Sequence, residues 1–568
     1  MNNLLPWSPL KNMRHLSSHL AALVTFSNTR HLLPLLQKVN RLVCSPLKNL
    51  HLFAHLRALI TFCKSLYRLL AFHVSPFFFQ LLYFIILSLF GFLGLKVSKP
   101  RIPVPASDLD LFFTSVSAST VSSMTVVEME AFSHSQLVVI LFLMFLGGEV
   151  LSSMLDLLYS SFILFKKQSL KDRETPLPLK QHPPMSTAHQ IEISLVSMQK
   201  QNEACTVDCS DPSVAKNDNM GRLRQNSIRC LAFVILGYLM VLHVAGSGLV
   251  SSYMRIMPSA GQVLRNKGID IYMFSVFTIV STFASCGFVP TNENMIVFRQ
   301  NPGLLLLILP FVFLGNTLYP PFLRLVVWAL EKVTKREEFS YIQNNYEEMG
   351  YGHMLSYAHC VCLVATVFGL NLTQLVLFCC MEWKSDSMEG LNSYQKLISS
   401  LFQISNARHA GESVFDLSTL SSATLVLFVV MMYLPPYTTF LPSARDRENE
   451  GRKEKRSLKE CLLFSQLCYL VIFVILICIT ERQSLREDPL NFNVLSITLE
   501  VVSAYGNVGF SMGYSCQRRL RQDANCRNEW VGFAGRWTNK GKSILVVIMI
   551  LGRIKKFNIN GGKAWLLS

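Results

Sequence analysis

The chain has 568 residues, a mean hydropathy of +0.34 and only 16% charged residues, which is poor in charge for a soluble protein of this length. Eight apolar runs recur along it. Each is close to the ~20 residues that a bilayer core requires, so the sequence predicts an integral membrane protein whose surface partner is lipid.

The net charge of +17 could indicate a nucleic-acid partner, but its distribution indicates a membrane surface instead. Residues 1–100 hold eleven Lys or Arg and no Asp or Glu. Under the positive-inside rule we interpret residues 1–71 as a basic cytoplasmic tail, and we expect no nucleic acid. Within this tail Ser8–Phe26 resembles Ser45–Phe62, and both could form amphipathic helices on anionic lipid. An organellar transit peptide is the alternative.

A polar stretch, Leu111–Glu130, lies between the apolar runs Phe72–Leu95 and Gln136–Phe165. It is too rich in Ser and Thr to span a bilayer. We interpret it as a re-entrant loop, in which a half-helix enters the membrane and extended backbone returns. Such backbone survives at that depth only where protein or water surrounds it. The alternative is an ordinary extracellular loop. With its flanking runs, the stretch forms a span–loop–span unit over residues 72–166.

The same arrangement recurs over residues 227–335, 336–443 and 460–568, with polar, charged linkers at 167–226 and 444–459. The composition of the first linker is typical of disorder. Four quasi-equivalent loops suggest a ring around a central axis, which is the architecture of a cation pore. The predicted fold class is therefore all-α and membrane-integral, with eight transmembrane helices and four re-entrant pore loops around one central cation pore.

The centres of the four loops carry Ser123, Gly287, Gly411 and Gly509. A loop helix of ~12 residues reaches about halfway across the bilayer core, where its C-terminal carbonyls and dipole favour a cation. Glycine then adopts positive φ cheaply and leaves the pore open, so the three glycines are predicted filter residues. A turn glycine is the alternative for any one of them alone. Ser123 occupies the fourth place, where we expect its Cβ to restrict the backbone and its hydroxyl to offer a different oxygen.

Several strings in this chain are similar to those of one transporter family. They are VSSMTVVEMEAFS, FLGGEV, STFASCGFVPTNENM, GNTLYPPFLR, RHAGES and YGNVGFSMGYSC. With the four loops, they resemble the plant HKT branch of the Trk/Ktr/HKT cation transporters over about residues 72–568. The resemblance implies passive cation transport across the plasma membrane by a homodimer with one pore per subunit. The sequence places the N- and C-termini in the cytoplasm. The resemblance also implies that Ser at position 123 accompanies sodium-selective uniport and Gly accompanies potassium permeation.

Arg553 follows Gly552 just after the last apolar run, Ile544–Leu551. The resemblance implies a basic residue that faces the pore on this final helix, and Arg553 matches it. The alternative is that Arg553 only begins the cytoplasmic basic flank. A charge within the membrane core is costly and usually faces a cavity or the protein interior.

Three acids and two cysteines are further candidates outside the filter itself. Cys516 and Cys526 lie on the side that we assign to the outside, where a disulfide could persist. The acids near the loops could concentrate cations at the mouth or form a solvated rim; they are Glu128, Glu130 and Glu412. We expect no cofactor and no structural metal, and sodium, or else potassium, at the filter.

Three other functions compete with sodium uniport. A membrane-embedded enzyme would need a catalytic pair or metal ligands, and the sequence has no HExxH or GxSxG motif. A potassium transporter or sodium–potassium symporter of the same fold is the main alternative, and Ser123 argues against it. A non-conducting scaffold would have no need of the four filter positions.

Overall fold

The structure is a computed structural model that describes most of the chain beyond the N-terminal tail. The described residues are 76–102, 107–159, 212–438, 466–519, 526, 528–530 and 532–558. Gln80–Ser568 forms one compact unit, and the structural account concerns this unit. The predicted tail at 1–71, the linker at 444–459 and most of the linker at 167–226 lie outside the described residues.

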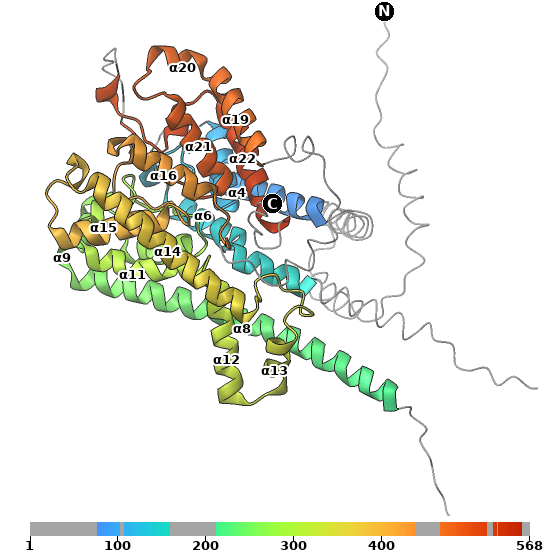
Figure 1. Cartoon of the computed structure of the whole chain (residues 1–568). Helices are drawn as coiled ribbons and strands as arrows, with labels where there is room; N and C mark the ends of the chain where they lie inside the picture. Colours follow the sequence, from blue (N-terminus) through green and yellow to red (C-terminus); the bar gives the residue numbers. More distant parts are fainter. Residues whose placement is uncertain are drawn as a thin grey trace, which may run out of the picture. The chain divides into compact units, whose positions relative to one another are not determined.

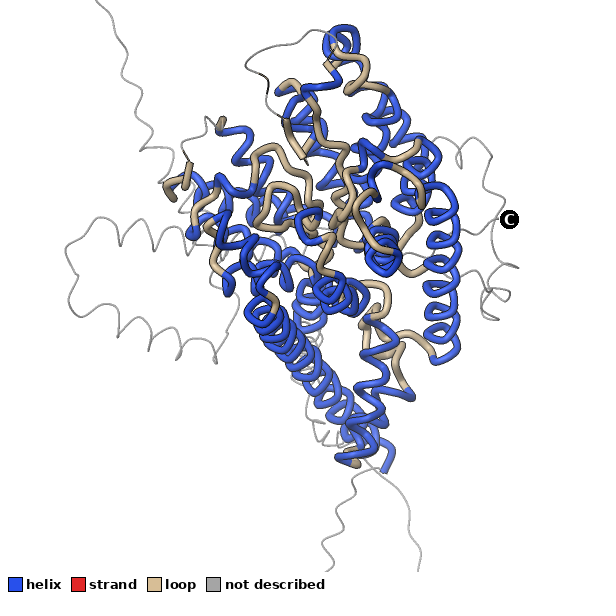
Figure 2. The backbone as a smooth tube through the Cα atoms, turned by 90° about the vertical axis from the view of Figure 1, so that its left-hand side faces the viewer, coloured by secondary structure: helices blue, strands red, loops and turns tan. Residues whose placement is uncertain are grey.

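The regular elements of the described residues are helices, apart from one isolated bridge between Tyr514 and Glu529 (Figures 1 and 2). They repeat as an incoming helix, a short pore helix and an outgoing helix. The incoming helices are α4 (Pro76–Val97), α8 (Pro212–Ile256), α14 (Tyr357–Glu382) and α19 (Gln466–Thr480). The pore helices are α5 (Asp108–Ser119), α10 (Ile271–Phe283), α15 (Ser393–Asn406) and α21 (Val494–Gly506). The outgoing helices are α6 (His134–Gly147), α11 (Pro302–Leu314), α16 (Ser422–Tyr433) and α22 (Asn539–Asn558).

Four further helices belong to the described part: α9 (Pro258–Lys267) and α20 (Arg482–Glu487) precede the pore helices of the second and fourth units, and α12 (Tyr319–Thr334) and α13 (Glu337–Asn344) lie between α11 and α14. The second incoming helix already starts at Pro212, so the end of the linker that we expected to be disordered is helical. The reason is continuity with the apolar span, because extending an existing helix costs less than nucleating a new one.

By length and composition, three of the described helices can cross a membrane, and two bent helix pairs raise this number to five. The shorter apolar helices are α10, α16, α19 and α21, and of these α19 begins where the described residues resume. Together with the fourfold repeat, these helices give the predicted fold class: an all-α integral membrane protein of four span–pore-loop–span units. The short pore helices are not counted as membrane spans in this fold class.

Each pore helix begins at a residue whose side chain caps its first turn. Ser107, Asp270, Asn392 and Asn493 each accept a hydrogen bond from the backbone N–H three residues later. Such a cap satisfies one of the four N–H groups that a helix start leaves unpaired, and is typically worth about 1 kcal/mol. The caps fix where the pore helices start, and so which residues arrive at their carboxyl ends.

The four units close into a ring because each pore helix packs against the outgoing helix of the preceding unit. The pairs are α10 with α6, α15 with α11, α21 with α16 and, across the chain termini, α5 with α22. The last pair joins the first unit to the fourth. This circular pattern explains why the four loops lie together in the interior, among the helices of Figure 2.

Glycines let three outgoing helices touch the carboxyl ends of their own pore helices. Gly147, Gly315 and Gly552 end the similar strings FLG, FLG and ILG. A Cβ on any of them would come closer than 3.0 Å to the carbonyl oxygen of Ser119, Phe283 or Tyr505, respectively. A larger residue at these positions would push the pore helix away, so these glycines set the position of the loops.

Two outgoing helices bend sharply near these glycines, which the sequence analysis did not predict. The bend is 54° between His134–Gly147 and Glu149–Tyr159, and 82° between α11 and α12. The third outgoing helix ends at Tyr433, just before Pro435 and Pro436, whereas α22 runs on without a break to Asn558. The breaks place polar residues inside the protein, where other side chains must satisfy them.

Candidate ion-conducting site

The four pore helices end in similar turns that aim the chain at the ring. The backbone N–H groups of Ser122, Cys286, Gly411 and Val508 each donate to the carbonyl five residues earlier, at 2.8, 2.9, 3.1 and 3.0 Å. In three of the loops the preceding residue has a left-handed backbone, as in a Schellman helix end; these residues are Val121, Ser285 and Asn507.

All four predicted filter residues also have left-handed backbones. The φ angle is 52° at Ser123, 86° at Gly287, 68° at Gly411 and 105° at Gly509. Our prediction that the Cβ of Ser123 keeps its backbone from this conformation is therefore wrong. A non-glycine residue in this region costs roughly 1–2 kcal/mol, which the packed ring can supply. Ser123 thus differs from the glycines by its hydroxymethyl group and not by its backbone.

Each filter glycine contacts the next loop in the order of the sequence. A Cβ on Gly287 would come closer than 3.0 Å to Ala410 O, and one on Gly411 closer than 3.0 Å to Val508 O. A Cβ on Gly509 would overlap Ser123 in the same way. Val121 of the first loop and Cys286 of the second belong to one buried apolar cluster, which completes the circle. The loops therefore form one closed ring in the order of the sequence.

Two buried polar side chains within the pore helices hold the returning limbs of the loops. Gln403 Oε1 accepts from the backbone N–H of Val414 and Phe415, at 2.8 and 3.3 Å. Glu500 Oε1 accepts from Ser511 Oγ at 2.6 Å and from Met512 N at 3.0 Å. The sequence analysis did not identify either residue. The available signal was a single long polar residue within each apolar pore-helix sequence, SSLFQISN and ITLEVVS.

The three acids near the loops do not form one solvated rim. Glu412 is fully buried and accepts a hydrogen bond from Thr282 Oγ1 of the preceding unit, so the alternative of a solvated rim fails for this residue. Glu130 lies 2.6 Å from Lys267 Nζ, which also lies 2.6 Å from a carboxylate oxygen of Glu293. Glu128 accepts from the Asn292 side chain at 2.9 Å. Glu128 and Glu130 therefore belong to a network that joins the first two units.

Arg553 lies inside the protein and is 1% exposed. Its Nη2 donates to Gly147 O at 2.5 Å, and its guanidinium lies 5.9 Å from the centre of the Phe84 ring. On the same helix, Met549 O accepts a hydrogen bond from Asn507 Nδ2, two residues before filter residue Gly509, at 3.1 Å. A residue of a solvated basic flank would be exposed, so the flank alternative fails for Arg553. The next basic residue, Lys555, donates to the Tyr505 hydroxyl at 2.7 Å.

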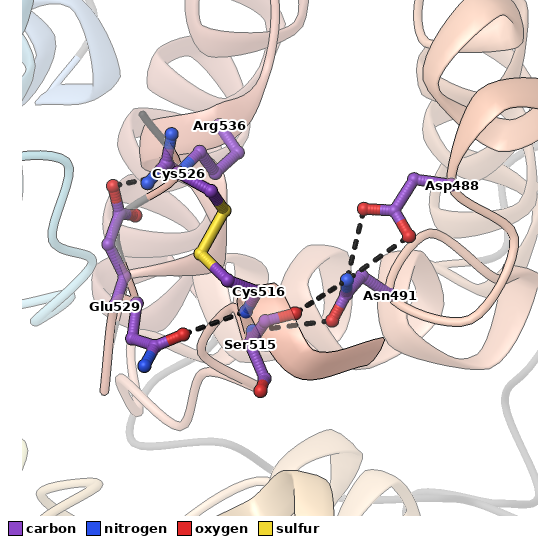
Figure 3. Close-up of a disulfide and its surroundings, with 8 residues drawn as sticks. Asp488, Asn491, Ser515, Cys516, Cys526, Glu529 and Arg536 are labelled. Carbon is purple, nitrogen blue, oxygen red and sulfur yellow. Dashed lines mark hydrogen bonds and ion pairs between the residues drawn. A yellow bond between two sulfur atoms is a disulfide. The ribbon is translucent and has the colours of Figure 1, made fainter. Parts of the chain in front are cut away.

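Cys516 and Cys526 form a disulfide in the segment that follows the fourth loop (Figure 3). The backbones of Tyr514 and Glu529 pair beside it, with N–H···O distances of 2.7 and 2.8 Å. Asn491 braces the same segment by donating to Ser515 O at 3.0 Å (Figure 3). The disulfide thus lies beside the bridge of Tyr514 and Glu529, in the segment that continues the returning part of the fourth loop.

The described residues contain no group of three or more His, Cys, Asp or Glu side chains that could hold a metal ion. The site is instead built from backbone carbonyls, hydroxyls and helix ends, which suit a weakly held monovalent cation. A closed ring of four pore loops within a multi-pass helical membrane protein defines the class of pore-loop cation transporters.

Comparison with known proteins gives the family. A family model described as TrkH, cation transport protein, matches residues 213–439 and 445–559. The chain belongs to this family of membrane cation transporters, which are not enzymes. Its similarity to two plant proteins confirms the resemblance to the HKT branch.

The chain is 48% identical to the cation transporter HKT1;3 of Oryza sativa subsp. japonica, over 87% of this chain and 92% of that protein. It is also 48% identical to the sodium transporter HKT1 of Arabidopsis thaliana, over 84% and 92%. A solved structure, the potassium transporter TrkH from Vibrio parahaemolyticus, aligns with a TM-score of 0.46 and 15% identity over 85% of this chain and 84% of that one.

Proposed function

We propose that this cation transporter is a passive, sodium-selective uniporter whose selectivity filter consists of Ser123, Gly287, Gly411 and Gly509. The observation that carries the proposal is the equivalence of these four residues in the ring. They share a left-handed backbone, and only Ser123 adds a side chain, which contacts Gly509. One quadrant of an otherwise uniform ring is therefore chemically different.

The physical argument concerns the cost of removing water from the ion. Inward carbonyls replace the hydration shell of a permeating cation, and sodium holds its water more strongly than potassium. A ring of four equivalent glycine loops favours the ion that dehydrates more easily. The hydroxymethyl group of Ser123 narrows one quadrant and offers an additional oxygen, which suits the smaller ion.

The remaining features of the proposal concern the membrane. The linkers between units are rich in charged residues and the N-terminal tail is basic, so we assign the linkers and both termini to the cytoplasm of a cell whose plasma membrane holds the protein. The disulfide then lies outside, where oxidised cysteines persist. Lipid surrounds the exposed apolar helix faces, and a homodimer would give two independent pores.

Currents in expressing oocytes test the proposal. We expect an inward current in pure sodium, a far smaller one in pure potassium, and a reversal potential in mixtures that follows sodium. An equal current in potassium would favour the alternative, a potassium transporter or sodium–potassium symporter of the same fold. Absence of any current from a surface-expressed chain would contradict conduction itself.

A further inference from the structure

The breaks in the outgoing helices bring charged and aromatic side chains together next to the ring. This group, the Glu149 cluster, consists of Glu149, Tyr319, Tyr351, His353, Tyr437 and Arg553. Its members come from the outgoing segments of all four units and from the segment before α14. None of these residues belongs to the filter, and only Arg553 was singled out from the sequence.

Glu149 is the centre of this cluster and lies directly after the bend in the first outgoing helix. Its Oε1 accepts a hydrogen bond from the Tyr437 hydroxyl at 3.3 Å. The same oxygen lies 3.8 Å from His353 Nε2. Arg553 Nη2 donates to the carbonyl of Gly147, two residues before Glu149, and the Glu149 carboxylate acts electrostatically on this guanidinium. One carboxylate therefore contacts Tyr437 and His353 and lies close in the chain to the group that holds Arg553.

Arg553 needs such a countercharge because it is buried. Its guanidinium donates a hydrogen bond to the carbonyl of Gly147, two residues before Glu149. A buried guanidinium without a nearby anion would be strongly destabilising. The carbonyl of Gly147 and the carboxylate of Glu149 flank the same bend, so together they can fix the position of the guanidinium.

His353 lies outside the membrane-spanning helices but is itself 7% exposed. Its Nε2 lies 3.0 Å from Ser153 Oγ, whereas its Nδ1 has no hydrogen-bond partner among the described residues. The ring centres of Tyr319, Tyr351 and Tyr437 lie 5.3, 5.3 and 5.6 Å from the His353 ring.

The charged and titratable groups around His353 come from every element that packs on it. They are Glu149 from the bent outgoing helix, Tyr319 from α12, Tyr351 from its own segment, Tyr437 from the segment after α16, and Arg553 of α22 through Glu149. Burial lowers the pKa of His353 below its ordinary value, and the charge of Glu149 opposes this shift. His353 is therefore neutral at neutral pH and gains a proton on acidification.

We propose that Glu149 is a positioning residue that holds Arg553 and offsets its charge beside the filter, and that protonated His353 competes for Glu149. The proposal rests on conduction through the ring, as set out under the proposed function. With neutral His353, the charges of Glu149 and Arg553 cancel. With protonated His353, the cluster gains one positive charge, which opposes the passage of a cation. Acidification on the side of the linkers should therefore reduce the current.

Currents from excised patches, with the pH varied on the linker side, test this proposal. Glu149→Gln should lower the cation current on the order of tenfold at neutral pH, the effect of one unit charge at ~10 Å through an effective dielectric constant of about 20. His353→Gln should leave the neutral-pH current near that of wild type and abolish its decrease in acid. The control Tyr437→Phe removes a hydrogen bond to Glu149 without changing charge, and should retain the acid response.

The double variant Glu149→Gln with Arg553→Gln separates a charge effect from misfolding. Its current should exceed that of Glu149→Gln alone, because the uncompensated charge is gone. Currents through Glu149→Gln that equal those of wild type at matched surface amount would overturn the positioning role. An acid response that persists in His353→Gln would overturn the competition. If potassium and not sodium carries the current, the proposal of sodium selectivity fails. The currents of the Glu149, Arg553 and His353 variants can then be compared in potassium, and the test of the cluster remains the same.

Thermal unfolding of the purified full-length protein provides a readout that needs no conduction. Because folding keeps His353 neutral, the unfolded chain takes up its proton first, and stability should fall as the pH drops below about 6.5. His353→Gln should remove this part of the pH dependence. Glu149→Gln should lower the unfolding midpoint less when Arg553→Gln is also present, since the buried charge is then absent. Additive shifts would overturn the pairing of Glu149 with Arg553.

Discussion

Ser123 and Gly509 are in contact where the fourth unit of the ring meets the first. A Cβ on Gly509 would come closer than 3.0 Å to both the Cβ and the Oγ of Ser123. The side chain that distinguishes the first loop is therefore packed against the glycine of the last. Substitutions at these two positions should not be independent.

Replacing Ser123 with glycine should admit potassium. The backbone already has the left-handed conformation that glycine adopts at little cost, so the main change is the space left beside Gly509. We expect a shift in the sodium-to-potassium preference on the order of tenfold, equivalent to about 1.4 kcal/mol. Reversal potentials in mixed solutions measure this shift. The matched variant Ser123→Ala keeps the Cβ and should lie between wild type and Ser123→Gly. A Ser123→Gly protein that conducts sodium and still excludes potassium would contradict the assignment.

The reverse change, Gly287→Ser, should abolish conduction rather than strengthen sodium selectivity. Its Cβ would overlap the carbonyl oxygen of Ala410, which is backbone and cannot rotate away. The third loop would have to move, and with it the adjoining filter residue Gly411. Sodium currents at matched surface amount check this outcome. Normal currents would show that the ring is looser than these contacts indicate.

The fourfold repeat and the ring of loops could be predicted from the sequence, whereas the backbone conformations and side-chain contacts within the ring could not. The four loops were recognisable because polar stretches between apolar runs recur with Ser123, Gly287, Gly411 and Gly509 at their centres. The conformation of Ser123 was mispredicted, because a local steric preference of 1–2 kcal/mol is smaller than what a surrounding ring imposes. The burial of Glu412 was missed for a similar reason: Thr282, which hydrogen-bonds it, comes from another unit.

The bends in the outgoing helices could not be read from periodicity. A Gly-Gly pair at 147–148 and the glycine at 315 are compatible with either a straight or a broken helix. Only the contact of Gly147 with Ser119 and of Gly315 with Phe283 explains why both are required. The Glu149 cluster follows from these bends, and so it too depends on contacts between units that a single sequence does not specify.

Arg553→Gln should change the size or rectification of the current and leave the sodium preference intact. The guanidinium is buried beside the ring but is not one of the four filter residues. Removing the guanidinium leaves the Glu149 carboxylate without its countercharge, which should change the barrier to cations whatever their identity. Arg553→Lys is the matched control, because it keeps the charge and should remain closer to wild type. Superimposable current–voltage curves for wild type and Arg553→Gln would rule out a barrier role.

Loss of the Cys516–Cys526 disulfide should destabilise the outer segment that holds it. Closing a short loop is typically worth about 2–4 kcal/mol, on a model in which the crosslink restricts the unfolded chain. The double variant Cys516→Ser with Cys526→Ser should therefore unfold at a lower temperature than wild type. Reductant should lower the midpoint of wild type and leave that of the double variant unchanged. Equal midpoints for the two proteins without reductant would show that the segment is held by its hydrogen bonds alone.

Glu500 should hold the fourth loop in shape, and its role can be separated from that of a charge that attracts cations. It is fully buried and accepts from Ser511 Oγ and Met512 N. Ser511 Oγ in turn accepts from the N–H groups of Gly532 and Phe533, so one carboxylate connects the pore helix, the returning limb and the segment before α22.

Glu500→Gln keeps an acceptor oxygen of the same reach and should preserve both current and ion preference. Glu500→Leu leaves the donors from Ser511 and Met512 without a partner, at a cost of about 1–3 kcal/mol for each buried group. It should therefore broaden the preference between sodium and potassium, or prevent folding. Surface amount and the unfolding midpoint distinguish these two results, and both support a structural brace. A Glu500→Gln protein that folds and reaches the surface normally but loses most of its sodium current would instead assign Glu500 a direct electrostatic role in conduction.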